Sequence, residues 1–259
     1  MPYFGIIKKK KMKKNKLILC TFSIIGLILT SCEPSVESPG SNDNSKITFL
    51  PLITLEGGDV VLDCNAISYS DPGAVASAGG VEIDLETVVS GKYFGGSSVD
   101  GPDSYDIAYS AFNSDDIPAT NFRSVLYPEC NGDLVNSIAG MYTGLVARNG
   151  SSPYSEAGPF IIKDLGNDRY AISDAQGGWY EYGRAIGVAY ATPGLILKAN
   201  DISANNFTSE GDVATNTFGG VNTFTGLKVD PVAKTLELTI DWSYGFEFVT
   251  VFTQTDIYY

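Results

Sequence analysis

The sequence predicts an all-β protein made of two successive β-rich domains. Short runs of alternating apolar and polar residues recur along the chain, and glycine-rich turn signals separate them. No stretch carries a sustained 3.6-residue apolar stripe of the kind that marks an amphipathic helix. A β-sandwich is therefore expected first, followed by a second sandwich or a barrel-like, lipocalin-like domain.

A lysine-rich start followed by a short apolar stretch predicts an exported protein. Seven lysines and no acidic residue precede Leu17, and the apolar stretch Leu17–Leu29 has 13 residues. An α-helix of that length reaches about 20 Å, which is too short for a hydrocarbon core of about 30 Å. Residues 1–31 are therefore expected to be a cleaved signal peptide rather than a membrane span.

The end of this apolar stretch carries a family resemblance. Leu29-Thr30-Ser31-Cys32 resembles the lipobox of bacterial lipoproteins. The resemblance implies that Cys32 is lipidated, becomes the first mature residue and anchors the chain to the outer membrane. The cell-surface face is expected, with the periplasmic face as the alternative. An ordinary signal peptide with an incidental cysteine is the other interpretation.

The charge of the mature chain limits its partners. The whole chain carries a formal charge of −13, and removal of the seven signal-peptide lysines leaves −20. So acidic a surface argues against nucleic acid and against a basic patch for anionic lipid. Contact with the membrane is therefore expected through the N-terminal lipid. Residues 32–46 are rich in Ser, Pro, Gly and Asn, so a flexible tether is expected there.

Residues 47–130 are predicted to form the first domain. Val81–Glu86 alternates apolar and acidic residues, and Ser104–Ala111 repeats the alternation, so each is expected to bury one face. The residues expected to face inward are Val81, Ile83, Leu85, Tyr105, Ile107, Tyr109 and Ala111. The remaining strands are expected at Ile47–Leu55, Asp59–Cys64 and Phe122–Tyr127.

Three motifs in this domain carry a second resemblance. Tyr69–Ala74 reads Y-S-D-P-G-A, Tyr105–Ala111 reads Y-D-I-A-Y-S-A, and Arg123–Val125 follows in the last strand. They resemble a bacterial immunoglobulin-like domain that recurs in surface lipoproteins of the Bacteroidetes type. The resemblance implies an immunoglobulin-like β-sandwich. Asp71 is interpreted as a turn-former within Asp71-Pro72-Gly73, with calcium ligation as the alternative.

Cys64 and Cys130 are predicted to form a disulfide. An exported chain reaches an oxidising compartment, where such bridges persist. This bridge would close a loop of about 67 residues and contribute about 4 kcal/mol in the chain-entropy model. Two buried free thiols are the alternative, because a sequence does not supply the Cα separation that a bridge requires.

Residues 134–259 are predicted to form a C-terminal all-β domain after the polar segment Asn131–Asp133. Gly166-Asn167-Asp168 lies between two β-rich runs, which is a strong hairpin signal. Thr235–Trp242 alternates and is expected to bury one face. Tyr244-Gly245 is expected to turn the chain into a last strand that begins at Phe246. The residues of Thr235–Trp242 expected to face inward are Leu236, Leu238, Ile240 and Trp242.

Segments of this second domain carry a third resemblance. Ile138–Tyr142, Tyr170–Asp174 and Gly177–Arg184 resemble the C-terminal domain of Bacteroidetes-type lipoproteins of unknown function. Many such lipoproteins are encoded beside glycan-uptake systems. The resemblance therefore implies a polysaccharide or oligosaccharide ligand and an outer-membrane uptake complex as partners, by analogy of context.

The residue content argues against most enzyme classes. The chain has no histidine, so Ser-His-Asp and Cys-His machinery and His-ligated zinc are excluded. No phosphate-binding loop or dinucleotide fingerprint is present. A glycosidase-like carboxylate pair remains open, but 30 acidic residues make close pairs common. No catalytic residue, metal or cofactor is expected, and the protein is not predicted to be an enzyme.

The candidate ligand site lies in Gly177–Arg184. Trp179, Tyr180 and Tyr182 are expected to supply ring faces for sugar C–H groups, and Arg184 is expected to supply a polar clamp. Trp179 has an alternative interpretation as a ring that closes one end of a barrel. Two functions follow: a glycan-binding accessory protein of an uptake system, or a structural or adhesive spacer without a small ligand.

Overall fold

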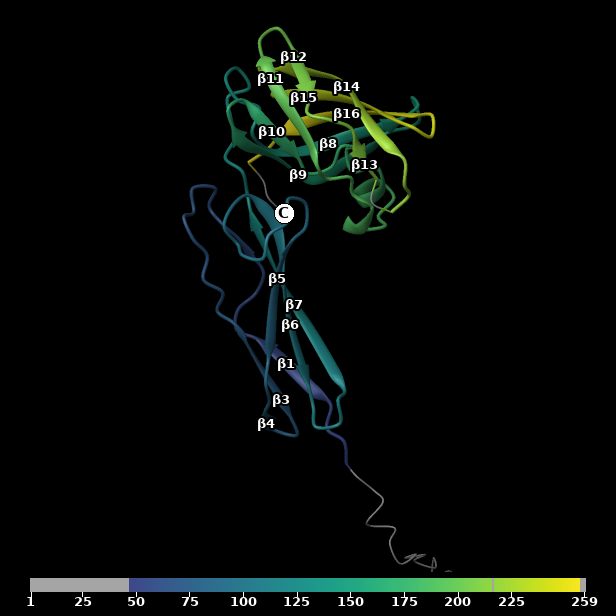
Figure 1. Ribbon diagram of the computed structural model, residues 1–259. Coiled ribbons are helices and arrows are strands. Elements are labelled where there is room, and N and C mark those ends of the chain that lie inside the picture. Colours follow the sequence, from purple (N-terminus) through teal and green to yellow (C-terminus); the bar gives the residue numbers. More distant parts are fainter. Residues whose placement is uncertain (1–46, 216, 257–259) are drawn as a thin grey trace, which may run out of the picture. The chain divides into compact units, whose positions relative to one another are not determined.

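The computed structural model describes residues 47–215 and 217–256, and within them the chain is almost entirely β (Figure 1). The predicted all-β fold class is confirmed. The predicted signal peptide, Cys32 and the tether lie outside the described residues. The two helical turns are the π-helix η1, Trp179–Gly183, and the 3₁₀-helix η2, Val188–Tyr190. In the part of the chain that the structure describes, no helix is both long and apolar enough to cross a membrane.

The N-terminal half, residues 51–127, holds two sheets. One has three strands in the order β1-β3-β4, and the other has four in the order β2-β7-β6-β5. All neighbours are antiparallel except β2 and β7. The strands are β1 (Pro51–Leu55), β2 (Val60–Val61), β3 (Ala74–Ala78), β4 (Val81–Glu82), β5 (Glu86–Gly91), β6 (Asp103–Phe112) and β7 (Pro118–Tyr127).

The two alternating segments of this half have different outcomes. In β6 the prediction is confirmed, because Tyr105, Ile107, Tyr109 and Ala111 are all buried. In Val81–Glu86 it is confirmed for Ile83 and Leu85, which are half-buried against the core cluster, and wrong for Val81 in β4, which is 67% exposed. The reason is that β4 pairs with the very end of β3 beyond a Gly-Gly turn, where no second sheet covers it.

A buried ion pair holds the two sheets of the N-terminal half together. Arg123 on β7 is fully buried and pairs with the Asp71 carboxylate. The guanidinium also donates to Tyr109 Oη at 2.6 Å and to the backbone carbonyls of Glu56 and Gly73. Both interpretations of Asp71 from the sequence omitted this partner. The three motifs that carried the immunoglobulin-like resemblance thus meet in one polar network.

The second half of the unit is a nine-stranded antiparallel sheet that curls into a half-barrel. Its order is β12-β11-β10-β9-β8-β16-β15-β14-β13. Adjacent strands in this sheet are consecutive in the chain, with the exception of β8 and β16. The strands are β8 (Gly140–Arg148), β9 (Tyr154–Gly166), β10 (Arg169–Ile172), β11 (Leu195–Asp201), β12 (Asn206–Ser209), β13 (Val213–Ala214), β14 (Val221–Asp230), β15 (Thr235–Trp242) and β16 (Phe246–Gln254).

Local patterns predicted this sheet well. Asn167 and Asp168 both have positive φ in the two-residue turn between β9 and β10, as a hairpin of this type requires. The inward residues predicted for β15 are all buried, Trp242 among them. β16 follows a turn at Gly245.

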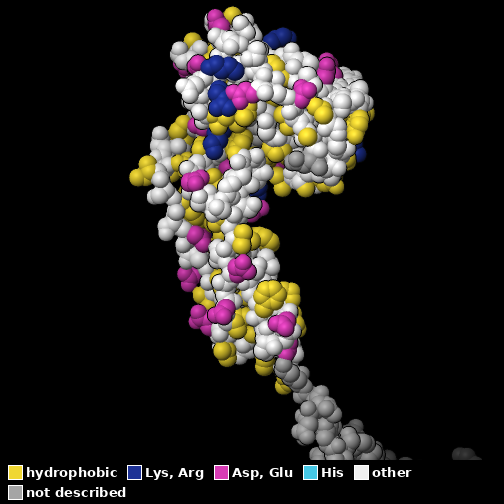
Figure 2. Space-filling view, in the orientation of Figure 1, with side chains coloured by type: hydrophobic (Ala, Val, Ile, Leu, Met, Phe, Trp, Pro, Cys, Tyr) yellow, Lys and Arg dark blue, Asp and Glu magenta, His cyan; other side chains and the backbone are white. Residues whose placement is uncertain are grey.

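The many acidic side chains on the visible surface agree with the acidic composition of the chain. Figure 2 shows Asp and Glu side chains scattered over the visible face of the described residues rather than gathered into one patch. Phe49–Tyr259 forms one compact unit that contains all three sheets. The domain boundary at Asn131–Asp133 stays a prediction.

Candidate functional site

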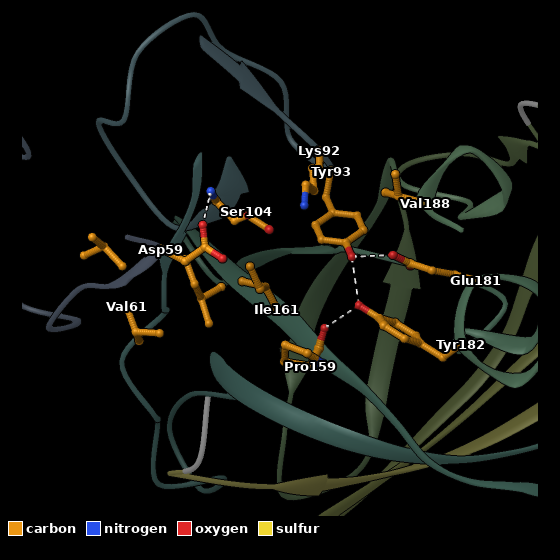
Figure 3. Close-up of a pocket in the computed structure, with 13 residues that line it drawn as sticks. Asp59, Val61, Lys92, Tyr93, Ser104, Pro159, Ile161, Glu181, Tyr182 and Val188 are labelled. Carbon is orange, nitrogen blue, oxygen red and sulfur yellow. Dashed lines mark hydrogen bonds between the residues drawn. The ribbon is translucent and has the colours of Figure 1, made fainter. Parts of the chain in front are cut away.

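A cavity of about 370 Å³ lies where strands of the N-terminal half meet β9 and η1 (Figure 3). Its size is within the range of small-ligand pockets. Its apolar lining is Val60, Val61, Leu126, Pro159, Ile161 and Val188, and its polar lining is Asp59, Lys92, Tyr93, Ser104, Ser124, Glu181 and Tyr182.

A chain of hydrogen bonds runs along one wall of the cavity. Tyr93 Oη lies 2.7 Å from Glu181 Oε1 and 2.9 Å from Tyr182 Oη, which in turn lies 3.1 Å from the Pro159 carbonyl oxygen. Figure 3 shows these contacts as three consecutive dashed lines. Two phenol protons satisfy two of the three contacts. A protonated Glu181 supplies the third proton, so that each pair of oxygens along these three hydrogen bonds shares one proton.

The surroundings of Glu181 favour its protonated form. Burial raises the pKa of this carboxyl above its usual range, although the Tyr93 hydrogen bond partly opposes the effect. Burial also raises the pKa of Tyr93 and of Tyr182, so both phenols keep their protons. The wall of the cavity is therefore a row of hydrogen-bonding groups in which burial favours the protonated forms.

Glu181 also carries an unused acceptor. Its Oε2 atom is buried and has no hydrogen-bond partner among the described residues, and the residue as a whole is 8% exposed. A buried polar atom left without a partner costs about 1–3 kcal/mol. A ligand hydroxyl that donates to this oxygen would recover that free energy.

Tyr93 is held in place by a buried carboxylate. Asp103 at the start of β6 accepts the backbone N–H groups of Tyr93, Phe94 and Ser104 at 3.1, 2.9 and 2.7 Å. A Cβ at Gly91 would lie 2.6 Å from the same carboxylate and 2.2 Å from a loop carbonyl, so only glycine fits there. The loop after β5 therefore presents Tyr93 in a fixed position.

Glu181 is held in place by a second buried carboxylate. Asp174 accepts the backbone N–H groups of Gln176, Gly178 and Thr192 at 2.8, 3.1 and 3.2 Å. Gly178 has a φ of 71°, and a Cβ there would lie 2.7 Å from the Phe160 ring. The turn before η1 is thus closely packed. Burial raises the pKa of Asp174 to about 7, with the nearby Glu181 charge as a further cause.

The charged groups at the cavity are few. Lys92 forms an ion pair with Asp106 at 3.0 Å, and Asp59 accepts the Ser124 backbone N–H at 2.9 Å. Among the described residues, no three His, Cys, Asp or Glu side chains are grouped closely enough to hold a metal ion. The arrangement is suited to hydroxyl groups, because neutral donors and acceptors predominate.

The predicted ligand residues lie in different environments. Trp179 and Tyr180 are buried in the core, 4% and 8% exposed, with the Trp179 ring 4.6 Å from that of Tyr154. Tyr182 lines the cavity. Arg184 follows η1, is exposed, and forms no ion pair within the described ranges. The structure therefore brings Tyr182 to the cavity and buries Trp179 and Tyr180 in the core.

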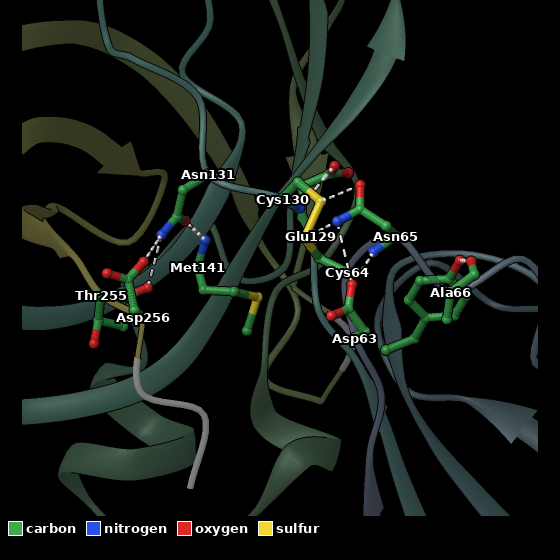
Figure 4. The surroundings of a disulfide bond; sticks show 11 residues. Asp63, Cys64, Asn65, Ala66, Glu129, Cys130, Asn131, Met141, Thr255 and Asp256 are labelled. Atoms are coloured by element: carbon green, nitrogen blue, oxygen red, sulfur yellow. Dashed lines mark hydrogen bonds between the residues drawn. A yellow bond between two sulfur atoms is a disulfide. The ribbon is translucent and has the colours of Figure 1, made fainter.

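Cys64 and Cys130 are joined by a disulfide with a Cα separation of 5.0 Å (Figure 4). The neighbouring Glu129 carboxylate accepts the backbone N–H of Asp164 in β9 at 3.1 Å. Asn131 accepts the Met141 N–H at 2.8 Å and donates to Asp256 at 2.7 Å. The segment around the bridge is thereby tied to three adjacent strands in the middle of the nine-stranded sheet, β9, β8 and the end of β16.

No motif in the sequence points directly to Tyr93 or Glu181. Tyr93 belongs to an aromatic pair before Gly95-Gly96, the same kind of pattern that drew attention to Gly177–Arg184. That similarity could have identified Tyr93 as a candidate ligand-binding residue. Glu181 sits between two tyrosines, and its burial depends on a contact 88 residues away in the chain.

Together, the fold and the cavity define an all-β protein with a curled C-terminal sheet and a hydroxyl-lined pocket. A family model described as a C-terminal domain matches residues 131–254. The crystal structure of the lipoprotein BT2262 from Bacteroides thetaiotaomicron is similar in fold. Its TM-score is 0.54 and its identity 22%, over 79% of this chain and all of that chain. The search of curated proteins found no match. Neither match tests the immunoglobulin-like assignment of the first half, which stays a prediction.

Proposed function

We propose that the protein is a lipid-anchored cell-surface protein that binds a saccharide, without catalysis, in the cavity beside Tyr93 and Glu181. The unpartnered Glu181 Oε2 carries this proposal, because it is a buried acceptor at a cavity of ligand size. Sugars offer many hydroxyl donors for such an atom, and their C–H faces pack on tyrosine rings. Arg184 remains a predicted polar contact of the ligand.

The anchoring part of the proposal rests on two observations. The segment ending at Cys32 resembles a lipobox, and a protein of the same fold is a bacterial lipoprotein. The outer membrane and a polysaccharide-uptake complex are the proposed setting. Cys32→Ala is expected to abolish palmitate labelling of the protein in its host. Normal labelling of this variant would contradict lipid anchoring.

The binding part is tested with neutral oligosaccharides on a glycan array, followed by calorimetry. Glu181→Met removes the acceptor at similar volume and is expected to weaken binding about tenfold, because a buried hydrogen-bonding group that loses its partner costs about 1–3 kcal/mol. Glu181→Gln keeps an acceptor and a donor toward Tyr93, so it is expected to bind within a few-fold of the wild type. Glu237→Met is the control, since Glu237 pairs with exposed Lys228 away from the cavity.

A spacer or adhesive protein without a small ligand is the second candidate. The burial of Trp179 and Tyr180 favours it, because rings inside the core are not available to a sugar. Trp179→Ala is then expected to lower the free energy of unfolding by about 3–5 kcal/mol. The absence of any bound glycan for the wild type would leave this candidate standing and would contradict saccharide binding.

A further inference from the structure

An arginine from β8 lies between aromatic rings at one end of the half-barrel. The guanidinium carbon of Arg148 is 5.1 Å from the centre of the Trp179 ring and 4.6 Å from that of Phe246. Arg148 Nη1 donates to Tyr180 Oη at 3.1 Å. These contacts fix both the plane and the position of the guanidinium, since it stacks favourably on aromatic faces.

The hydrogen-bonding capacity of Arg148 is largely unused. A guanidinium has five N–H donors, and the hydrogen bond to Tyr180 uses one of them. Among the described residues, no Asp or Glu oxygen lies within 4.0 Å of it, in contrast to Arg123 and Arg169, which both have carboxylate partners. A preoriented guanidinium with free donors matches a carboxylate, which it binds through two parallel hydrogen bonds.

Two exposed rings lie close to the rings that contact this arginine, since Trp242 also contacts Phe246. Tyr244 is 57% exposed and contacts Trp242, and Phe218 is 41% exposed and contacts Tyr180. Phe246 also lines a shallow depression of about 660 Å³. Ring faces of this kind pack on the C–H faces of sugars.

The position of Arg148 in the sheet favours a saccharide over a peptide. Peptides commonly bind to β-proteins by adding a strand to a free sheet edge. Arg148 lies on β8, which has β9 and β16 on its two sides, so no edge is available there. Asp241 and Glu247 line the adjoining depression, and they would repel a ligand with many negative charges.

We propose that Arg148, with the half-buried ring of Phe246 and the exposed rings of Tyr244 and Phe218, forms a second binding site for a saccharide that carries a single carboxylate. This site is distinct from the cavity beside Glu181, and none of these four residues lines that cavity. The chemical class of the ligand is an oligosaccharide with one uronic acid residue.

The test is calorimetry on the wild type with two trisaccharides that differ at the terminal residue, glucuronic acid in one and glucose in the other. The acidic trisaccharide is expected to bind at least tenfold more tightly. Arg148→Gln is expected to remove this preference, and Arg148→Lys to remove most of it, because lysine lacks the planar fork. Lys228→Gln removes an exposed positive charge elsewhere and is expected to leave the preference intact.

The outcomes separate the two proposed sites. Glu181→Met is expected to leave the carboxylate preference unchanged, and Arg148→Gln to leave binding of neutral sugars in the cavity unchanged. Equal binding of the two trisaccharides would overturn the proposal, as would an equal loss of preference in Lys228→Gln. Arg148-dependent binding of a peptide with a free C-terminus, without the acidic trisaccharide, would also overturn it. Near-ultraviolet circular dichroism checks that the Arg148 variants keep their aromatic packing.

Discussion

The N-terminal half and the nine-stranded sheet are stabilised in different ways. In the part of the chain that the structure describes, the core cluster of the N-terminal half has eight fully buried apolar residues, whereas that of the nine-stranded sheet has 24. The smaller core is supplemented by the buried Arg123–Asp71 pair and by the disulfide. Small cores often need such additions, because the fraction of surface buried falls with size.

The larger core makes a different kind of site possible. Its aromatic rings are numerous enough to fill one end of the half-barrel and still surround Arg148. Its buried carboxylate, Asp174, has no cationic partner among the described residues and is satisfied by backbone N–H groups. Both halves therefore hold a buried carboxylate on backbone N–H groups, Asp103 in the first and Asp174 in the second, whereas the buried ion pair belongs to the first half.

Removal of the buried arginine is expected to have the largest effect on stability. Arg123→Met leaves the Asp71 carboxylate without its cation in a half-buried position. Loss of one partner of a buried pair costs about 3–5 kcal/mol. Urea unfolding monitored by tyrosine fluorescence measures this loss. Lys228→Met breaks an exposed pair and is the control, with an expected cost of about 0–1 kcal/mol. Similar losses in the two variants would contradict the role assigned to Arg123.

The second half is expected to respond to pH through Asp174. Its pKa is raised from 3.8 to about 7 by burial, so the folded protein binds a proton that the unfolded chain has released above pH 4. The stabilisation is fully present below about pH 4 and is lost as the pH rises through about 7. At 1.36 kcal/mol for each pKa unit, the free energy of unfolding falls by about 4 kcal/mol at most.

Urea unfolding at several values between pH 4 and pH 8 checks this expectation. Asp174→Asn cannot titrate, so its stability should change less over the same interval, whatever its absolute value. Burial also raises the pKa of Glu181, which adds a change of the same sign that Glu181→Gln removes. A wild-type stability that increases from pH 4 to pH 7 would contradict the assignment.

The pH prediction depends on a residue whose environment the sequence could not reveal. Alternation and turn residues identified β6, β15 and the hairpin at Asn167-Asp168, because these features are local. The cysteine count and the predicted export singled out Cys64 and Cys130, but the length of an intervening loop does not fix a Cα separation. Alternation failed at Val81, where burial depends on whether a second sheet covers the strand.

The candidate site was harder to predict than the fold. Gly177–Arg184 was identified from its rings, yet the structure buries Trp179, and the guanidinium that lies over its ring is that of Arg148 on β8. The partners of Glu181 and Asp71 come from distant strands. Contacts of this kind follow from topology and not from any spacing along the chain.

Loss of the disulfide is expected to affect the first half more than the second. Cys64→Ala with Cys130→Ala opens a loop of about 67 residues, which costs about 2–4 kcal/mol in typical cases. Hydrogen exchange should increase in β2 and β7 and change little in β15 and β16. Mass spectrometry of the unreduced wild type should find neither thiol free. Complete alkylation of both cysteines in the native protein would contradict the bridge.

The smallest effect is expected at the segment that joins the two halves. Asn131 receives the Met141 N–H and donates to the Thr255 carbonyl and to Asp256, so it ties the start of β8 to the end of the chain. Asn131→Ala is expected to lower the free energy of unfolding by about 1 kcal/mol, since the groups left behind are partly open to water.

Limited proteolysis tests whether this segment is a boundary between two independent domains. Gly132 is also held, by hydrogen bonds to Ala139 and Gln254, so the wild type should be cut there only slowly. Asn131→Ala should be cut faster at the same place, because opening of the segment precedes cleavage. Asn200→Ala, at an exposed position near the end of β11, is the control and should leave the rate unchanged. Rapid cleavage of the wild type at Asn131–Asp133 into two stable fragments would show instead that the halves are separate domains and that these hydrogen bonds contribute little to joining them.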